Sequence, residues 1–179
     1  MKVNNTSRLT FGLMSKKDSE LLFQLDQDPE VMRFINGGKL TSRKEIEEIY
    51  LPRMKSYTEP NKGWGIWKVC LLEDDLFIGW ILVRPMQFFS DSPEFDNIEV
   101  GWRFSKQSWG NGYATEAAQA LKKALIENGN ISKLSAIAME DNNASINIMK
   151  KLGMEYLKTD IHKDPLGDSE VVFYQLNIE

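Results

Sequence analysis

Two glycines lie one residue apart in the stretch QSWGNGYATEA, directly before a run of strong helix formers. Glycine loses more backbone entropy on folding than any other residue, so the bare backbone must serve a purpose there. A helix that begins near Tyr113 leaves its first N–H groups without partners, and its dipole adds positive potential at the same end. Because Gly110 and Gly112 would let an anion approach these groups closely, the pattern favours a phosphate or pyrophosphate site.

Two familiar phosphate-binding loops do not match this stretch. The Walker A loop ends in Gly-Lys-Ser/Thr, and no such tripeptide follows Gly110. The dinucleotide-binding fingerprint needs a third glycine where Thr115 stands. Since short glycine motifs often occur by chance, a turn that only joins a strand to a helix is an equal alternative on spacing alone.

Other reactive side chains are few. Cys70 lies inside an apolar segment, which predicts a small buried hydrophobe with an inert thiol. His162 is the only histidine, and we expect it in a solvated loop over residues 159–169. One histidine and one cysteine do not suit a metal site.

The elements around the glycines predict a strand, a turn and a helix in succession. Residues 98–104 (IEVGWRF) alternate apolar and polar side chains, which indicates a half-buried strand. A helix over 113–128 has an alanine and leucine stripe and ends at Gly129. A strand over 133–139 follows, and then a short helix that is capped by Asn142 and ended by Gly153. The longer helix therefore connects two strands as a crossover.

The remaining segments predict one α/β domain over residues 1–179, without repeats or a linker. Strands are expected at 7–13, 154–160 and 170–176, and 64–72 with 76–84 read as an antiparallel hairpin. Residues 16–35 are helical in pattern but broken by Pro29, and 41–57 form a helix capped by Thr41 or Ser42. Residues 84–97 are expected to form a loop.

Composition restricts the class of partner and the compartment. The chain has 179 residues and a formal net charge of −4, and no basic run suggests nucleic acid as a partner. A single cysteine excludes an internal disulfide framework and favours the cytoplasm. No apolar run reaches about 18 residues, so no membrane span is expected.

Three segments resemble the GNAT family of N-acetyltransferases. Gln107, Gly110 and Gly112 match the signature Gln/Arg-x-x-Gly-x-Gly/Ala. Residues 142–154 resemble the family's Asn-x-x-Ser and Lys-Leu-Gly-Phe element, with Met154 in place of the phenylalanine. Residues 7–35 are similar to the start of the subgroup that includes the ribosomal-protein alanine N-acetyltransferases. The resemblance covers nearly the whole chain.

This resemblance implies a twisted, mostly antiparallel mixed sheet whose central strands splay apart, flanked by helices. Acetyl-CoA lies in that gap as a co-substrate, without a metal. Here the splayed strands would be 98–104 and 133–139, and Gly101 would suit a bulge that opens the gap.

The resemblance also implies a set of cofactor contacts. The backbone of 102–105 would pair with the pantetheine arm, and Gln107 with the N–H groups of 109–114 would hold the pyrophosphate. Asn142 and Ser145 would contact the cofactor from the other side, although simple helix capping is an alternative for both. Trp109 would either anchor the loop or cover the cofactor. The full set is Trp102, Arg103, Phe104, Ser105, Gln107, Trp109, Gly110, Asn111, Gly112, Tyr113, Ala114, Asn142 and Ser145.

The implied reaction is direct attack of a primary amine on the thioester in a ternary complex. Deprotonating an ammonium suits a carboxylate, and Glu99 lies on the polar side of its strand beside the gap. A cross-strand ion pair with Arg103 or a lysine is the alternative role for Glu99. Many family members have a tyrosine acid where Met149 stands, so Ser145 or water is the candidate acid here.

The acceptor is expected to be a protein N-terminus or a small amine. By the resemblance, it would contact residues 32–40 and 84–97, where Phe34, Phe88, Phe89 and Phe95 are candidate pocket residues. Loop anchoring is the alternative role for these phenylalanines. A non-catalytic module that senses acetyl-CoA is the alternative function. The chain is expected to be a monomer or a homodimer.

Overall fold

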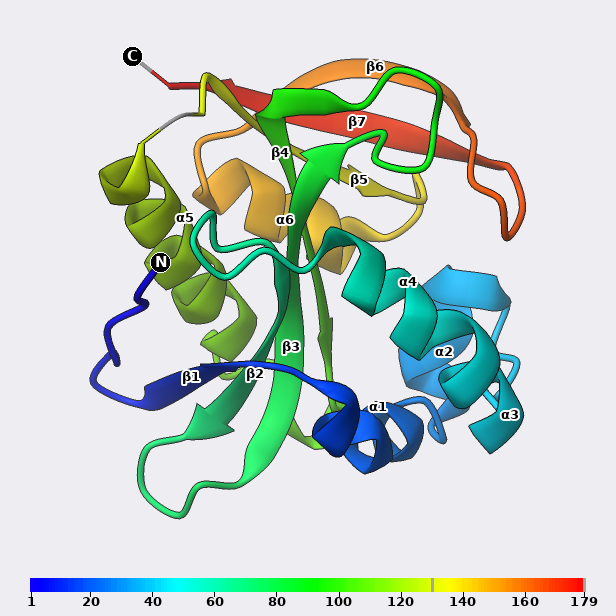
Figure 1. The fold of residues 1–179 in the computed structure, drawn as a ribbon, viewed down its shortest axis with the longest axis vertical. Helices are drawn as coiled ribbons and strands as arrows, with labels where there is room; N and C mark the ends of the chain where they lie inside the picture. Colours follow the sequence, from blue (N-terminus) through cyan, green and yellow to red (C-terminus); the bar gives the residue numbers. More distant parts are fainter. Residues whose placement is uncertain (130, 179) are drawn as a thin grey trace.

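The computed structural model describes residues 1–129 and 131–178, and its centre is a seven-stranded mixed sheet (Figure 1). The strand order is β1-β2-β3-β4-β5-β7-β6, and within the described residues β4 with β5 is the one parallel pair. The strands are β1 (Leu9–Leu13), β2 (Gly65–Leu71), β3 (Phe77–Met86), β4 (Glu94–Phe104), β5 (Lys133–Ala138), β6 (Glu155–His162) and β7 (Ser169–Asn177).

Between β1 and β2 lies a helical segment in which polar residues and a proline define several helix starts. It contains η1 (Lys16–Asp18), α1 (Ser19–Leu25), α2 (Pro29–Asn36), α3 (Arg43–Glu45), η2 (Ile46–Tyr50) and α4 (Leu51–Tyr57). Asp28 caps α2 and Pro29 occupies its first turn, so the predicted break at Pro29 is confirmed. Ser42 and Glu45 form a capping box at the start of α3.

The crossover helix α5 (Tyr113–Asn128) has the predicted bounds. Its inner stripe is buried, with Ala117 and Leu121 fully covered, and Gly129 ends it with a positive φ of 75°. The short helix α6 (Asn143–Lys151) follows β5, and Asn142 caps it as expected. The turn η3 (Lys106–Ser108) lies between β4 and the glycine stretch.

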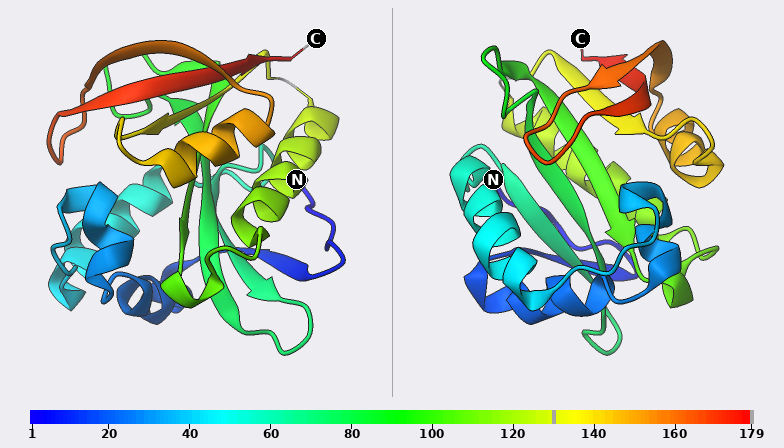
Figure 2. Two further views of the ribbon diagram at one scale, coloured as in Figure 1. Left: turned by 180° about the vertical axis from the view of Figure 1, so that it is seen from behind. Right: turned by 90° about the vertical axis from the view of Figure 1, so that its right-hand side faces the viewer.

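The two faces of the sheet carry separate apolar clusters. The larger cluster packs β3 and β4 side chains, such as Ile81 and Ile98, against α5 and α6. The smaller cluster packs the other face, including Ile66 and Trp80, against α1, η2 and α4. Figure 2 shows these two groups of helices on opposite sides of the strands.

The parallel pair β4 and β5 separates after a short ladder. Pairing runs from Asn97 with Lys133 to Glu99 with Ser135, and in the part of the chain that the structure describes no strand pairs with the rest of β4 on this side. In Figure 1, β6 and β7 cross the upper part of the molecule while β4 runs down its centre. The predicted splay is thus present. The predicted bulge at Gly101 is wrong, because β4 keeps a regular register with β3 from Ile98 to Phe104.

Two predicted boundaries were also wrong. The expected loop over 84–97 is much shorter, because β3 continues to Met86 and β4 already begins at Glu94. Arg84 lies opposite Glu99 and donates to its carboxylate across the two strands. The β3–β4 pairing therefore continues through these polar residues, where the sequence predicted a loop. His162 is the last residue of β6, and its ring lies edge-on to Phe173.

Candidate active site

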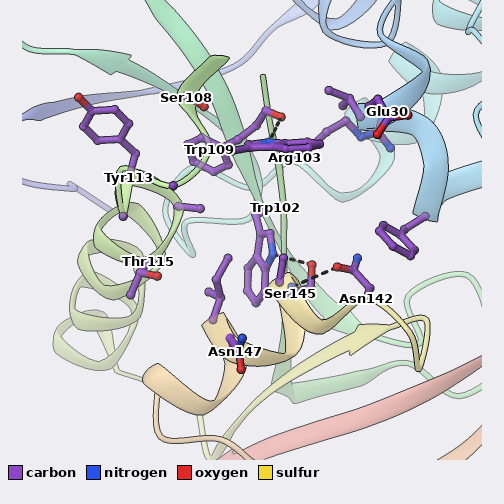
Figure 3. A pocket seen from close by; sticks show the side chains of 18 of the residues that line it. Glu30, Trp102, Arg103, Ser108, Trp109, Tyr113, Thr115, Asn142, Ser145 and Asn147 are labelled. Carbon is purple, nitrogen blue, oxygen red and sulfur yellow. Dashed lines mark hydrogen bonds between the residues drawn. The ribbon is translucent and has the colours of Figure 1, made fainter. Parts of the chain in front are cut away.

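A cleft of about 470 Å³ lies where β4 and β5 separate. Its walls come from the end of β4, the glycine stretch with the first turn of α5, one side of α6, and α2. Trp102 lies across its middle, between α5 and α6 (Figure 3). Three parts of the chain that are distant in sequence therefore share one cavity.

The glycine stretch, residues 109–112, wraps the N-terminal end of α5. Gly110 and Gly112 have positive φ angles of 76° and 77°, a backbone conformation that other L-residues adopt only at a cost. A Cβ at Gly110 would meet no atom within 4 Å. The glycines are thus required first by backbone conformation, and the space beside Gly110 is open. Gly112 directly precedes α5, so the first N–H groups of the helix, which have no partner within it, lie next to this stretch.

Trp109 both anchors the glycine stretch and lines the cleft. Its indole N–H donates to the carbonyl oxygen of Phe104 at 2.9 Å, while 47% of the residue remains exposed. The Asn111 side chain donates to the carbonyl oxygens of Ser108 and Trp109 and so braces the turn from within. The two roles that the sequence left open for Trp109 are therefore compatible.

The free edge of β4 presents main-chain groups to the cleft. Ser105 N–H donates to Ile78 O on β3 at 2.9 Å. In an antiparallel pair, such bonded residues alternate with residues whose N–H and C=O groups face the other way. The backbone groups of Trp102 and Phe104 consequently face the gap, whereas those of Arg103 and Ser105, which were predicted to pair with the cofactor as well, face β3.

Trp102 and Ser145 join β4 to α6 across the gap. The Trp102 indole N–H donates to Ser145 Oγ at 3.1 Å (Figure 3). Ser145 N–H in turn donates to the capping oxygen of Asn142 at 3.1 Å. Capping by Asn142 is therefore present, and both Asn142 and Ser145 line the cleft. The Trp102–Ser145 bond has no local sequence signal, since it joins residues 43 positions apart.

Most of the predicted cofactor set lines this cleft. The lining members are Trp102, Arg103, Phe104, Trp109, Gly110, Gly112, Tyr113, Ala114, Asn142 and Ser145. Ser105, Gln107 and Asn111 lie in the same turn but outside the lining. Ser108 and Thr115, which the prediction left out, do contribute to it.

The α2 helix forms the wall opposite α5. Phe34 and Ile35 present apolar side chains to the cleft, and Glu30 lies one turn earlier on the same helix. Of the four predicted acceptor phenylalanines, Phe34 alone lines this cleft. Phe88 and Phe89 pack edge-on against Tyr57, and Phe95 stacks on Trp64.

A buried ion pair fixes the position of the segment that carries α2. Arg103 lines the cleft with part of its side chain, but its guanidinium donates to Asp26 at 2.5 Å. The other oxygen of Asp26 accepts from Thr41 at 2.8 Å. Asp26 ends α1 and Thr41 precedes α3, so this network ties both ends of the α2 segment to β4.

Glu99 does not lie in the lining of the cleft. It is 4% exposed at the last paired position of β4 with β5, and it accepts from Arg84 Nε at 2.8 Å. The ion pair that was the alternative role for Glu99 is therefore present, with Arg84 in place of Arg103 or a lysine. Burial raises the pKa of the neighbouring Tyr57 to about 12, only partly opposed by the charge of Arg84. Tyr57 therefore stays protonated beside this pair.

Met149, Cys70 and His162 lie away from the cleft. Met149 is fully buried in the larger apolar cluster. Cys70 is buried in β2, and burial raises the pKa of its thiol. Within residues 1–129 and 131–178, no group of three or more His, Cys, Asp or Glu side chains could hold a metal ion. No helix in these ranges is long and apolar enough to cross a membrane.

The comparisons with known proteins identify a family. Residues 8–155 match the model of the acetyltransferase (GNAT) domain. The FsC-acetyl coenzyme A-N(2)-transacetylase of Aspergillus fumigatus is 29% identical over 89% of this chain and 67% of its own length. The uncharacterized protein YkkB of Bacillus subtilis is 31% identical over 86% of each chain.

Solved structures show the same fold. A GNAT-family acetyltransferase from Bacillus anthracis aligns with a TM-score of 0.76 at 22% identity, over 99% of this chain and 98% of its own. The aminoglycoside acetyltransferase AAC(6')-Ib in complex with coenzyme A aligns with a TM-score of 0.73 at 15% identity, over 94% of each chain. RimL, a ribosomal L7/L12 alpha-N-protein acetyltransferase in complex with coenzyme A, aligns with a TM-score of 0.74 at 14% identity, over 98% and 97%.

Proposed function

This chain belongs to the acetyltransferase (GNAT) domain family, and we propose that it moves the acetyl group of acetyl-CoA to a primary amine by direct attack in a ternary complex. The observation that carries this proposal is the cleft between β4 and β5. One end of the cleft carries the N-terminus of a 16-residue helix behind two glycines with positive φ. Its floor is an unpaired strand edge. The helix N-terminus suits an anionic group of a ligand, and the unpaired strand edge suits a ligand arm that carries amide groups.

The residues present fit acetyl-CoA in their chemistry. The pyrophosphate would lie at the α5 end, on the N–H groups of residues 110–114, because backbone donors and the helix dipole both favour an anion there. The pantetheine amides would bond the gap-facing backbone groups of Trp102 on β4. Phe104 would contribute its N–H alone, because its carbonyl oxygen already accepts from the Trp109 indole. Asn142 and Ser145 would contact the same arm from α6. When bound, acetyl-CoA supplies the activated thioester.

The chain itself must orient the thioester and manage two protons. The amine nitrogen forms the new bond to the carbonyl carbon as the C–S bond breaks, so the amine loses a proton and the thiolate gains one. A main-chain N–H facing the gap near Phe104 can donate to the carbonyl oxygen. Ser145 Oγ already accepts from Trp102, so its own proton is available for the thiolate side.

Glu99 is our proposal for the residue that takes the amine proton. It lies at the last paired position of β4 with β5, next to the point where the two strands separate. The pair with Arg84 holds its carboxylate in place at 2.8 Å. For proton transfer, a water would have to bridge the carboxylate and the amine.

We place the acceptor amine on the α2 side of the cleft. Phe34 and Ile35 offer apolar contact, and Glu30 adds a carboxylate on the same wall that suits a positively charged acceptor. A small amine or a protein N-terminus fits this description. Among the solved structures with the same fold, one is named an aminoglycoside acetyltransferase and another a ribosomal L7/L12 alpha-N-protein acetyltransferase.

A screen of acceptors tests the proposed function. Small polyamines, aminoglycosides and peptides with free N-termini would each be mixed with acetyl-CoA, while release of the CoA thiol is followed. We expect at least one acceptor to release thiol in proportion to enzyme and to gain one acetyl group by mass spectrometry. Acetyl-CoA binding without turnover across all classes would instead indicate a cofactor sensor.

A further inference from the structure

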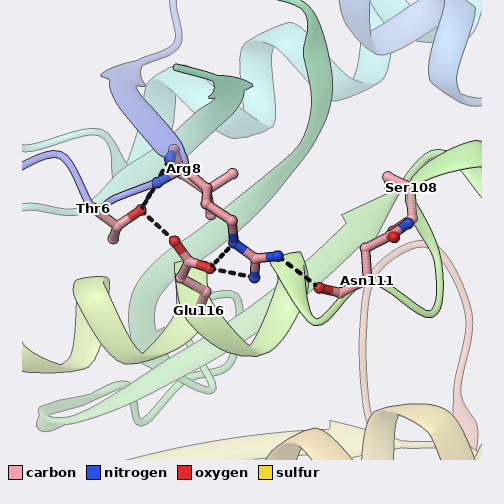
Figure 4. A network of polar contacts seen from close by, with 6 residues as sticks. Thr6, Arg8, Ser108, Asn111 and Glu116 are labelled. Carbon is pink, nitrogen blue, oxygen red and sulfur yellow. Dashed lines mark hydrogen bonds and ion pairs between the residues drawn. The ribbon is translucent and has the colours of Figure 1, made fainter. Parts of the chain in front are cut away.

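The N-terminal segment before β1 reaches the glycine stretch from outside the cleft. Arg8 donates through Nε to Glu116 Oε2 at 2.7 Å, and through Nη1 to the carbonyl oxygen of Asn111 at 3.1 Å (Figure 4). Its guanidinium also lies 4.5 Å from the centre of the Tyr113 ring. One side chain therefore contacts the glycine stretch and the first turn of α5 together, although 103 residues separate Arg8 from Asn111.

Thr6 completes the network from the same segment. Its hydroxyl donates to the other oxygen of Glu116 at 2.5 Å and accepts from the N–H of Leu9 at 2.9 Å. Both carboxylate oxygens of Glu116 are thus engaged by residues of the segment before β1. Hydrogen bonds from Thr6 and Arg8 lower the pKa of Glu116 even though its burial acts in the opposite direction.

The bond from Arg8 to Asn111 O has a consequence for the next peptide N–H. In a trans peptide the C=O and the following N–H point in opposite directions. Holding Asn111 O toward Arg8 therefore turns Gly112 N–H away from β1, and Gly112 lines the cleft. Gly112 has a positive φ of 77°, which glycine adopts without steric cost, so its φ alone does not fix the peptide and the contact from Arg8 restricts it.

We propose that Arg8, braced by Glu116 and Thr6, is the positioning residue that holds the glycine stretch in its anion-binding shape. The inference rests on the proposed binding of acetyl-CoA by this stretch. Arg8 contacts the outer side of the loop and acts through the Asn111–Gly112 peptide. A planar guanidinium with several donors can bridge a carboxylate and a carbonyl at once, which a lysine ammonium on a flexible stem does poorly.

Removing Arg8 should act on cofactor affinity more than on turnover. In Arg8→Met the loop loses its hold on Asn111 O, and Glu116 keeps an unpaired negative charge beside the anion site. We expect the Kd of acetyl-CoA to rise about tenfold, which is about 1.4 kcal/mol. The KM for acetyl-CoA should rise similarly, with kcat at saturation nearly unchanged. Arg8→Lys should raise the Kd of acetyl-CoA about as much as Arg8→Met, because the planar guanidinium with its several donors is needed and not the positive charge alone.

Arg43 offers a matched control. It forms the same kind of pair, with Glu20 at 2.5 Å, and it stacks on the Phe23 ring at 3.9 Å, but it lies outside the cleft lining. Arg43→Met should leave the Kd of acetyl-CoA unchanged. Glu116→Gln is the second variant of the network, and it should weaken binding less than Arg8→Met because Arg8 keeps its bond to Asn111.

Hydrogen exchange without cofactor tests the loop by itself. Amides of 109–114 should exchange faster in Arg8→Met than in the wild type or Arg43→Met. If exchange and Kd in folded Arg8→Met both match the wild type, the inference is overturned while the proposed function stands. A wild-type Kd for Arg8→Lys would also overturn it, because charge alone would then suffice. Failure of the wild type to bind acetyl-CoA would instead count against the proposed function.

Discussion

Glu99 and Arg84 form a buried pair at the point where β4 and β5 separate, with side chains only 5% and 10% exposed. Removing one member of such a pair leaves the other charge buried without compensation, at a cost of about 3 kcal/mol. A loss of activity in a single variant could therefore reflect unfolding. Any test of Glu99 as the general base must separate the two effects.

We predict that Glu99→Gln lowers both stability and turnover, whereas Glu99→Gln with Arg84→Met recovers stability alone. The double variant removes both charges, so its free energy of unfolding should exceed that of the single variant. Turnover at pH 7 should stay about 10²–10⁴-fold below the wild type in both, as expected for loss of a general base. The deficit should shrink at high pH, where the amine is already neutral. Wild-type turnover in the double variant would exclude Glu99 as the base.

Substitution of Cys70 tests whether the acetyl group passes directly from acetyl-CoA to the amine. The thiol is 7% exposed in β2, and the raised pKa that follows from its burial leaves little thiolate at neutral pH. Cys70→Ala should keep most of the wild-type turnover. An acetyl group trapped on Cys70 during turnover, seen by mass spectrometry of a tryptic digest, would contradict attack in a ternary complex.

At the scale of elements, β4 and α6 are joined through Trp102, and the glycine stretch is joined to β4 through Trp109. Both indoles line the cleft, whereas Trp64 is buried outside the lining. Tryptophan emission should therefore respond to a ligand that enters this cleft.

We predict that acetyl-CoA changes the fluorescence of the wild type and of Trp64→Phe to similar extents. In the variant with both Trp102→Phe and Trp109→Phe the change should be largely lost, because the remaining indoles lie outside the cleft. Acetyl-CoA affinity measured by calorimetry would check that the double variant still binds. A full fluorescence change in a double variant that binds would place the ligand elsewhere.

The elements were predictable where a local pattern decides the structure. Pro29 and Gly129 define helix ends through their own backbone preferences, and both were predicted, whereas the cap by Asp28 was not. The extension of β3 and β4 through residues 84–97 was not, because Arg84 and Glu99 satisfy each other only after the strands pair. The contact of Arg8 with Asn111 likewise depends on tertiary packing and has no local signal.

For the whole molecule, the cleft is assembled by the sheet topology. Its walls come from α2, from the β4–α5 connection and from α6, which the central sheet and the Arg103–Asp26–Thr41 network bring together. Two of these walls were predicted from motifs with fixed spacing. The α2 wall was expected only in general terms, because helix amphipathicity does not say which cavity a helix will face.

Binding of the anionic part of acetyl-CoA by the glycine stretch can be tested most directly at Gly110. A Cβ there meets no atom within 4 Å, whereas at Gly112 it would lie 3.7 Å from Arg8 Nη2, where a new carboxylate could pair with Arg8. Asn and Asp both tolerate a positive φ, so Gly110→Asn and Gly110→Asp differ mainly in charge.

Calorimetric titration of acetyl-CoA into these two folded variants is the decisive measurement. A negative charge beside the α5 N-terminus would oppose the pyrophosphate, so we predict that Gly110→Asp binds acetyl-CoA at least about tenfold more weakly than Gly110→Asn, or about 1.4 kcal/mol. Equal affinities for acetyl-CoA in the two variants would contradict the account.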